Sequence, residues 1–336
     1  MPSYSVPLRD MKFVYNELFD PTEISALPGF EDATEDLINP ILEEAARLAE
    51  NELFPLNTSG DLEGCQFDNG HVTTPQGFID AYRQYAEGGW VGLPCDPKYG
   101  GQGIPAAINV LMEEMACSAN VSFATYVGLT RGAYRAVNTF ANDDLKNQFL
   151  PKMVSGEWSG TMCLTEPQCG TDLGLIKTKA TLQSDGTYTL SGTKIFITAG
   201  EHDLTQNIIH LVLGRLPDAP KGIKGISLFL VPKFLPDTEG NPSTRNPIFC
   251  TRIENKMGIK ASATCEMNLD GATGWLIGEP HKGMRAMFTM MNDARLGVGI
   301  QGLGIGESAY QAAATYARDR QQGRALTGAK TPDSPA

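Results

Sequence analysis

Apolar residues recur every three or four positions through much of residues 33–158, which is the spacing of one face of an α-helix. The first predicted helix follows Thr34, a residue type that favours helix N-caps, and is expected to end at Pro55. One predicted stripe of this helix is Leu37, Ile41, Ala45, Leu48 and Glu52. Further helices are predicted over residues 76–89, 104–115, 121–140 and 142–154.

Residues 160–280 carry the pattern of short β-strands. Runs rich in β-branched and aromatic residues alternate with turn dipeptides such as Asp185-Gly186. The predicted strands cover residues 177–183, 187–198, 207–216, 225–234, 263–270 and 274–278. Helical spacing returns at Lys282 and continues to Arg320.

This order of elements predicts an α+β multidomain protein rather than the βαβ alternation of a nucleotide-binding fold. We expect an N-terminal helical domain over residues 1–158 and a middle β domain, a barrel or sandwich, over residues 159–280. Residues 281–336 are expected to begin a C-terminal helical bundle.

The late helix contains Gly297-Val-Gly299-Ile-Gln-Gly302, which spells the dinucleotide-binding fingerprint G-x-G-x-x-G. That fingerprint binds a dinucleotide only where a strand leads into a helix N-terminus, and here it lies inside a helical run. We therefore favour a packing role, in which small residues let two helix backbones approach closely, over dinucleotide binding.

The charge balance limits the classes of ligand. The chain has 27 Lys and Arg against 39 Asp and Glu, a net charge of −12, and no basic block, so nucleic-acid binding is not expected. No run of 18 apolar residues or apolar leader is visible, which predicts a cytoplasmic protein without an integral membrane segment. The seven cysteines form no C-x-x-C pair and the four histidines lack metal-ligand spacing, so we expect free thiols and no metal site.

Two short segments carry the residues best suited to ligand binding. Residues 162–174 form a predicted loop whose amides and hydroxyls could face a ligand. In the strand after it, simple alternation puts Phe196 and Thr198 on one face and Ile195 and Ile197 on the other. A ring and a hydroxyl on one face suit a flat heteroaromatic ligand, although a core aromatic beside a β-forming threonine explains the same residues.

Together these segments, CLTEPQCGTD and KIFIT, resemble the acyl-CoA dehydrogenase family, in which C-x-T-E-P-x-x-G-[ST]-D and K-x-[WF]-I-T recur at this separation. The resemblance covers essentially the whole chain, because the family also has helical, β and helical domains in that order. Asp293-Ala-Arg295 and the segment from Tyr316 to Arg320 are similar to the family's D-x-x-R and Y-x-x-x-R positions. The ends of the chain resemble the longer bacterial branch of 3-methylmercaptopropionyl-CoA dehydrogenases, and the C-terminal part of that pattern is expected to be missing.

The resemblance implies FAD as the cofactor. It places FAD against Met162, Leu164, Thr165, Gly170, Thr171, Phe196, Ile197 and Thr198. The Thr198 hydroxyl would reach flavin N5 and Thr165 the pyrimidine side of the ring. Gly170 and Thr171 would line the boundary between FAD and the acyl-CoA, with Thr171 also touching substrate.

Two arginines complete the implied site. Arg295 would lie near the acyl-CoA, and Arg320 would reach the FAD diphosphate of a neighbouring subunit, which implies at least a homodimer. The alternative for each is an arginine on a helix surface with its charge in water.

The implied reaction is α,β-dehydrogenation of an acyl-CoA thioester, with electrons passed on to an electron-transfer flavoprotein. The family's catalytic Glu lies either beyond the position of Ala336 or at the position of Ala294. Asp293 is rotated about 100° around the helix from that position, and Glu166 suits a structural role better than that of a base. No catalytic residue is identifiable in this chain; the Glu is expected C-terminal to Ala336, and the chain alone is expected to be inactive and to hold FAD weakly.

Two other functions remain open at this point: a flavin or acyl-CoA binding protein without catalysis, and an acyl-CoA oxidase that passes electrons to oxygen. The acyl chain preference is also open. His202 either approaches the edge of the flavin or is an ordinary loop histidine.

Overall fold

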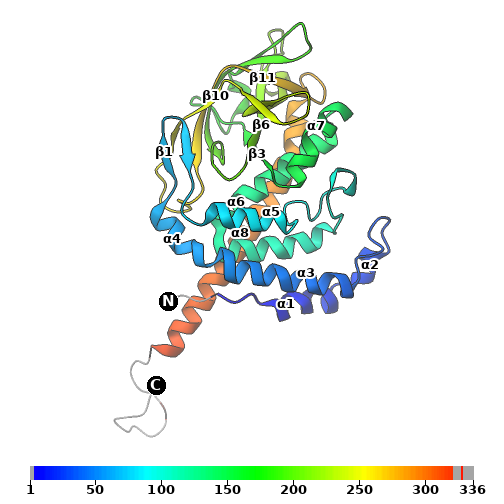
Figure 1. Cartoon of the computed structure of the whole chain (residues 1–336), viewed down its shortest axis with the longest axis vertical. Helices are drawn as coiled ribbons and strands as arrows, with labels where there is room; N and C mark the ends of the chain where they lie inside the picture. Colours follow the sequence, from blue (N-terminus) through cyan, green and yellow to red (C-terminus); the bar gives the residue numbers. More distant parts are fainter. Residues whose placement is uncertain (1–3, 321–326, 328–336) are drawn as a thin grey trace.

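The computed structural model describes residues 4–320 and residue 327, and has a β region at one end and helices at the other (Figure 1). The helices are α1 (Leu8–Phe13), α2 (Pro21–Ser25), α3 (Glu35–Leu48), α4 (Pro55–Glu63), α5 (Phe78–Glu87), α6 (Ala106–Phe140), α7 (Asp143–Val154) and α8 (Gly283–Asp319), with π-helical turns at Val14–Leu18 and Ala49–Leu53. The predicted order of helices, strands and a final helix is confirmed. Among the described residues, no helix is long and apolar enough to cross a membrane.

The helix α3 lies where the sequence predicts it, but the face that it buries differs in part from the predicted stripe. It begins after Thr34, whose side chain makes no capping hydrogen bond. The residues that α3 and the following turn bury are Ile38, Leu42, Ala45, Ala46, Ala49 and Leu53. Of the predicted stripe, Ala45 is buried and Ile41 and Leu48 are partly buried against the same core, whereas Leu37 is 41% exposed, so the prediction is wrong for Leu37. Two neighbouring rows of this helix are apolar, and spacing alone does not select between them. Pro55 does not end the helical path but begins α4, at a position where no amide proton is needed.

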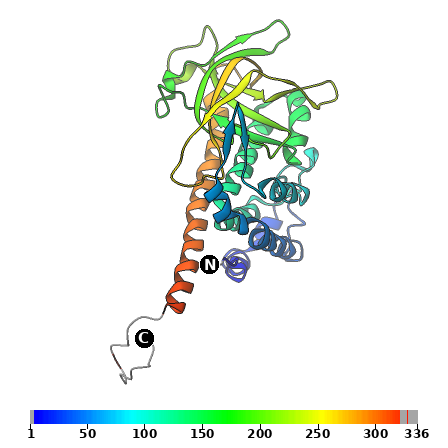
Figure 2. The ribbon, with the colours of Figure 1, turned by 60° about the vertical axis from the view of Figure 1, so that its left-hand side comes forward.

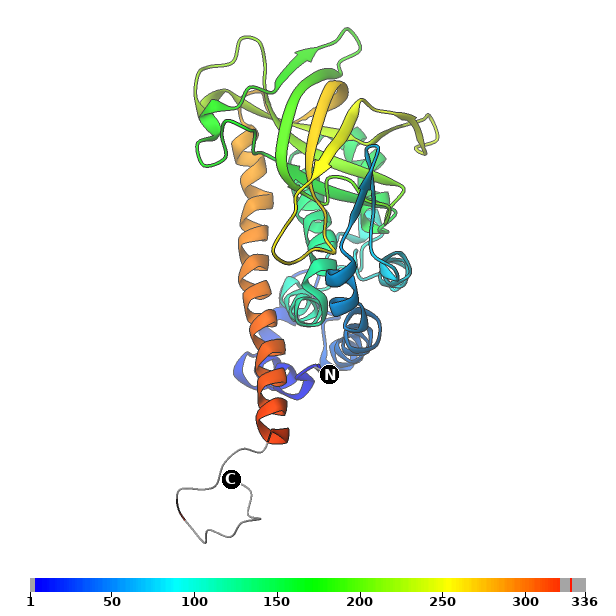
Figure 3. The same ribbon diagram turned by 90° about the vertical axis from the view of Figure 1, so that its left-hand side faces the viewer.

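The long helix α6 is interrupted at Asn120, whose φ of −159° and ψ of 90° are not helical. The Asn120 side chain donates to the Leu53 carbonyl oxygen (3.2 Å) and accepts from the Phe123 amide (3.1 Å), which caps the second half of the helix. The prediction of separate helices on either side of residue 120 matches this interruption. Both halves pack beside α8, which runs along the molecule (Figure 3).

The strands are β1 (Gln66–Asp68), β2 (His71–Thr73), β3 (Trp158–Cys163), β4 (Lys179–Leu182), β5 (Tyr188–Thr198), β6 (Asn207–Arg215), β7 (Ile226–Pro232), β8 (Phe234–Pro236), β9 (Pro242–Arg245), β10 (Ile248–Ile253) and β11 (Thr264–Ile277). Seven of them form one sheet in the order β10-β11-β5-β4-β6-β3, with β7 pairing both β11 and β6. The pairs β11-β5-β4-β6-β7 therefore make a closed circuit, as a barrel does.

Two hairpins lie outside this sheet and were not predicted. The hairpin β1-β2 belongs to the helical half of the sequence but lies beside the β region (Figure 2). Val72 of β2 is buried in the same apolar cluster as Cys250 of β10. The hairpin therefore joins the two regions through apolar packing.

Only one of the late glycines in α8 makes a close helix contact. A Cβ at Gly304 would lie 2.9 Å from the Ser118 amide nitrogen of α6, whereas one at Gly297, Gly299 or Gly302 would meet nothing within 4 Å among the described atoms. The packing role is confirmed for Gly304 and is wrong for the fingerprint glycines in the described structure. Because all of them lie inside α8, the dinucleotide alternative has no strand leading into it.

Candidate functional site

A buried ion pair joins the predicted ligand loop to the strand β5. Lys194 Nζ lies 2.8 Å from Glu166 Oε1, and the two side chains are 0% and 3% exposed. Lys194 also donates to the Leu164 carbonyl oxygen (3.1 Å), and the Ile195 amide donates to the Thr165 carbonyl oxygen (2.9 Å). The charged residues of the two sequence motifs therefore hold the motifs together.

The Glu166 carboxylate is fully engaged. Its Oε1 accepts from the Thr178 amide (3.0 Å) and hydroxyl (2.6 Å), and its Oε2 from the Lys177 amide (2.6 Å) and Gln168 Nε2 (2.6 Å). Burial alone raises the pKa of Glu166, but the Lys194 ammonium and these hydrogen bonds outweigh it and lower that pKa to about 2. A carboxylate with so many partners is a poor proton acceptor, which supports its structural role.

A bulge in β5 alters which residues share a face. Lys194 pairs with Met267 and Ile197 with Cys265, so Ile195 and Phe196 together oppose the single residue between them on β11. Lys194 and Ile197 are consequently both buried, although three positions separate them. The simple alternation expected for this strand is therefore wrong across the bulge.

The bulge leaves Phe196 at the surface. Its φ is +59°, in the left-handed region that few non-glycine residues adopt, and its side chain is 59% exposed. The neighbouring Thr198 carbonyl oxygen accepts from the Thr161 hydroxyl (2.7 Å), which fixes the end of the strand. An exposed ring thus lies two residues from a threonine whose side chain faces a cavity.

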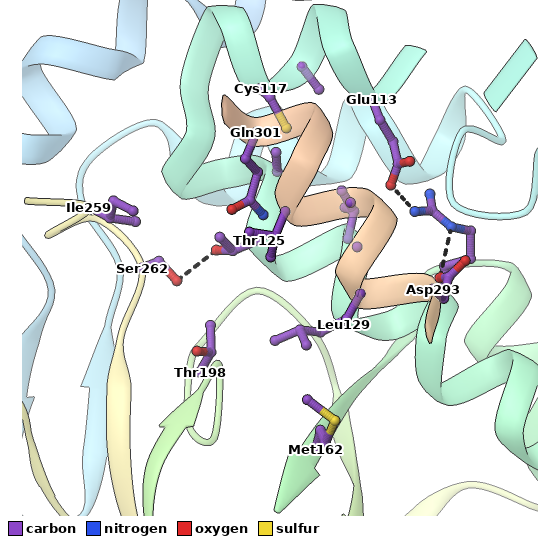
Figure 4. Close-up of a pocket in the computed structure, with 18 of the residues that line it drawn as sticks. Glu113, Cys117, Thr125, Leu129, Met162, Thr198, Ile259, Ser262, Asp293 and Gln301 are labelled. Atoms are coloured by element: carbon purple, nitrogen blue, oxygen red, sulfur yellow. Dashed lines mark hydrogen bonds and ion pairs between the residues drawn. The ribbon is translucent and has the colours of Figure 1, made fainter. Parts of the chain in front are cut away.

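That cavity has a volume of about 420 Å³ and lies between the β region and the helices (Figure 4). Met162 of β3 and Thr198 of β5 form its wall on the strand side, and α6 and α8 form the opposite wall. The loop before β11 closes a third side, where the Thr125 hydroxyl of α6 donates to the Ser262 hydroxyl (2.8 Å). Most of the lining surface is apolar, which suits a ligand that is itself largely apolar.

Charged side chains from three helical segments line one side of the cavity. Arg131 makes ion pairs with Glu113 through Nη2 and with Asp293 through Nε (3.7 Å), and Arg135 lies 2.7 Å from the other Asp293 oxygen. Figure 4 shows Glu113 and Asp293 together on the side of the cavity away from Thr198. We call Glu113, Arg131 and Asp293 the charged wall.

The predicted site residues divide into three groups. Met162 and Thr198 line the cavity, while Leu164 and Thr165 are half-buried in the loop that follows β3 and are not among the lining residues. Gly170 and Thr171 are exposed on the same loop. Ile197 is 2% exposed and packs in the sheet core, so its backbone alone can face a ligand.

The two predicted arginines lie outside the cavity. Arg295 is exposed on α8, where it donates to Asn292 Oδ1 (2.9 Å) and covers the Phe288 ring at 5.4 Å. Its neighbour Ala294 does line the cavity. Arg320 follows the last residue of α8, with its amide bonded to the Tyr316 carbonyl oxygen (2.8 Å).

His202 is an interior residue rather than a loop residue at a cavity. It is 1% exposed; Nε2 lies 2.9 Å from the Ser159 hydroxyl and Nδ1 accepts from the Leu204 amide (3.2 Å). The Tyr126 ring meets it edge-on at 5.2 Å. Burial, and then the charge of Lys233, lower the pKa of His202 to about 3. This position indicates a structural role.

No sequence motif marks the cavity wall that α6 contributes. Glu113, Thr125 and Arg131 lie in ordinary helical patterns and belong to no motif. Their one shared signal is that they are polar residues within strongly apolar helical stretches. That signal does not say that they face a cavity together.

Comparison with known proteins agrees with this geometry. Models of the N-terminal and middle domains of acyl-CoA dehydrogenase match residues 38–157 and 161–272. The 3-methylmercaptopropionyl-CoA dehydrogenase of Ruegeria pomeroyi is 45% identical over 326 residues, 97% of this chain and 55% of that protein. A butyryl-CoA dehydrogenase of Syntrophomonas wolfei is 37% identical over 98% of this chain and 56% of its own length. The chain thus spans about half the length of the curated relatives it matches.

Solved structures give the same result. The butyryl-CoA dehydrogenase of Megasphaera elsdenii is 29% identical with a TM-score of 0.71, over 86% of this chain and 70% of that one. An acyl-CoA dehydrogenase of Bacillus anthracis, solved with FAD, is 26% identical with the same TM-score, over 87% of this chain and 46% of that one. From its two matched domains and its fold, the chain belongs to the acyl-CoA dehydrogenase family.

Proposed function

We propose that this chain is part of an FAD-dependent acyl-CoA dehydrogenase, which removes one hydrogen each from the α and β carbons of an acyl-CoA thioester. The observation that carries this proposal is the cavity between the flavin motifs and the helices. Thr198 and Met162, both residues of the flavin motifs, form one wall of it, and apolar residues of α6 and α8 form the other. An acyl chain could lie between these walls with its reacting carbons toward Thr198.

The residues beside the cavity fit an isoalloxazine ring. Phe196 offers an exposed flat ring. Thr198 offers its hydroxyl, because its backbone carbonyl oxygen already accepts a hydrogen bond from the Thr161 hydroxyl. Gly170 lets this loop fold tightly on itself, because a Cβ there would lie 3.1 Å from Thr165 Cγ2. The bound flavin would supply hydride acceptance at N5. This chain would supply the hydroxyls of Thr165 and Thr198 to orient the ring and apolar walls to exclude water.

The proton acceptor is not assigned to a described residue. Both carboxylates that line the cavity in the described structure, Glu113 and Asp293, are paired with Arg131. Ala294 occupies the family position immediately before Arg295. We therefore propose that the base is a Glu beyond Ala336, and that the chain alone is inactive.

The remaining expectations are part of the same proposal. We propose the domain limits 1–158, 159–280 and 281–336, with Thr171 and Arg295 near the substrate and Arg320 at the FAD diphosphate of a second subunit of a homodimer. Electrons would pass to an electron-transfer flavoprotein in the cytoplasm. A structure of the electron-transferring flavoprotein of Acidaminococcus fermentans is among the fold neighbours, at 26% identity and a TM-score of 0.71.

Anaerobic mixing of the full-length, FAD-loaded protein with acyl-CoA thioesters tests this function. We expect at least one of butyryl-, octanoyl- and 3-methylmercaptopropionyl-CoA to bleach the flavin absorbance. Binding of these thioesters without any bleaching would instead favour a protein that binds but does not dehydrogenate. Rapid reoxidation of the reduced flavin by oxygen would identify an oxidase.

A further inference from the structure

The charged wall is unusual because it borders a cavity that is otherwise largely apolar. The side chains of Glu113, Arg131 and Asp293 are only 18%, 9% and 11% exposed. They come from the first half of α6, the second half of α6, and α8. Three separate segments therefore place charge at one point of the cavity surface.

The wall has no charge left over for a ligand. Arg131 lies between the two carboxylates, and Asp293 has a second cation in Arg135. The remaining cation of the described cavity lining, Lys256, is not part of the wall: it lies on the loop before β11 and donates to the carbonyl oxygens of Ile259 and Ser262 at 2.6 Å each. A ligand that separated any of these charges from its partner would leave that charge buried and unpaired, which is strongly unfavourable.

We propose that Glu113, Arg131 and Asp293 determine acyl specificity by limiting this cavity to short, uncharged acyl groups. The inference rests on the proposed function, since it names the substrate class of that same cavity. A long alkyl tail would have to displace paired charges and would gain no contacts in return. An acyl group that ends in a carboxylate would meet two carboxylates whose only shared cation is already paired.

Glu113→Gln is the most informative variant because it removes one negative charge and keeps the shape of the side chain. It leaves Arg131 with a single carboxylate inside the cavity. The neighbouring Glu114 is also half-buried on α6 but does not line the cavity, so Glu114→Gln is a matched control. Asp293→Asn makes the same test from α8 if Glu113→Gln does not fold.

The test measures binding of butyryl-, dodecanoyl- and glutaryl-CoA to the full-length, FAD-loaded protein by titration calorimetry. We expect the unaltered protein to bind butyryl-CoA at least about tenfold more tightly than the other two. Glu113→Gln should improve glutaryl-CoA binding about tenfold and change butyryl-CoA binding by less than about threefold, whereas Glu114→Gln should change neither.

The outcomes separate the two proposals. No binding of any thioester would contradict the proposed function itself. Tight butyryl-CoA binding with an unchanged glutaryl-to-butyryl ratio in both Glu113→Gln and Asp293→Asn would overturn the specificity role of the wall. Dodecanoyl-CoA binding as tight as that of butyryl-CoA by the unaltered protein would also overturn it.

Discussion

Two clusters of buried charge, one between the loop and strand of the flavin motifs and one at the cavity, differ in their surroundings. The Glu166–Lys194 pair is buried, and its Glu166 carboxylate also accepts hydrogen bonds from Thr178, Lys177 and Gln168. The charged wall on the helices faces a cavity and retains some exposure. The first cluster holds a loop against a strand, and the second shapes a surface that a ligand can meet.

The difference shows how far burial determines the role of an ion pair. A charged group that is fully enclosed and fully hydrogen-bonded cannot contact a ligand. Removing it leaves the opposite charge buried, with neither a partner nor water to stabilise it. A pair at a cavity wall can be partly rehydrated when one member is lost. We therefore expect the first cluster to affect mainly stability and the second to affect both stability and ligand choice.

The largest effect is expected for Lys194→Met, which leaves the Glu166 carboxylate buried without its cation. It should lower the free energy of unfolding by about 3–5 kcal/mol, measured by urea denaturation. Arg83→Met removes an exposed pair with Asp80 and should cost less than about 1 kcal/mol. Equal losses in the two variants would show that burial of the Glu166–Lys194 pair does not increase its contribution to stability.

Arg131→Met should have a smaller effect on stability, about 1–3 kcal/mol by the same measurement. Asp293 keeps its pair with Arg135, and water in the cavity can reach Glu113. A loss larger than that of Lys194→Met would mean that the wall is as enclosed as the strand-side pair.

Thr198→Val removes one hydroxyl from the strand side and should weaken FAD binding by about 1 kcal/mol. Because valine has nearly the same shape and also favours strands, stability should stay unchanged. FAD retention measured by equilibrium dialysis, with melting temperature as the control, tests this. Unchanged FAD affinity would mean that the hydroxyl makes no bond to the flavin.

The smallest expected effect is a pH dependence of the free energy of unfolding, and it arises from a residue on the strand side. His202 has a pKa of about 3 in the folded protein and near 6.5 in the unfolded chain. As the pH falls, His202 is therefore protonated in the unfolded chain before it is protonated in the folded protein. The stabilisation by neutral His202 is complete well above pH 6.5 and is lost as pH falls from there toward 3. Between pH 7.5 and 6 the loss should be about 0.8 kcal/mol, and His202→Asn should remove that part of the slope. An unchanged slope would show that His202 is not held neutral.

The sequence could predict what lies in short contiguous segments. The loop at residues 162–174 and the strand with Thr198 were visible as motifs, and the fold followed from helical and strand spacing. The β5 bulge was not visible, because it depends on the register with β11. The charged wall was not visible either, since Arg131 and Asp293 are 162 positions apart and meet only when α8 packs on α6.

The most direct test measures FAD binding and glutaryl-CoA binding side by side in the full-length protein, Thr198→Val and Glu113→Gln. We expect Thr198→Val to weaken FAD binding, and Glu113→Gln to leave FAD binding unchanged while it tightens glutaryl-CoA binding about tenfold. Weaker FAD binding in Glu113→Gln, with glutaryl-CoA binding unaltered, would contradict the assignment of the two walls to two different ligands.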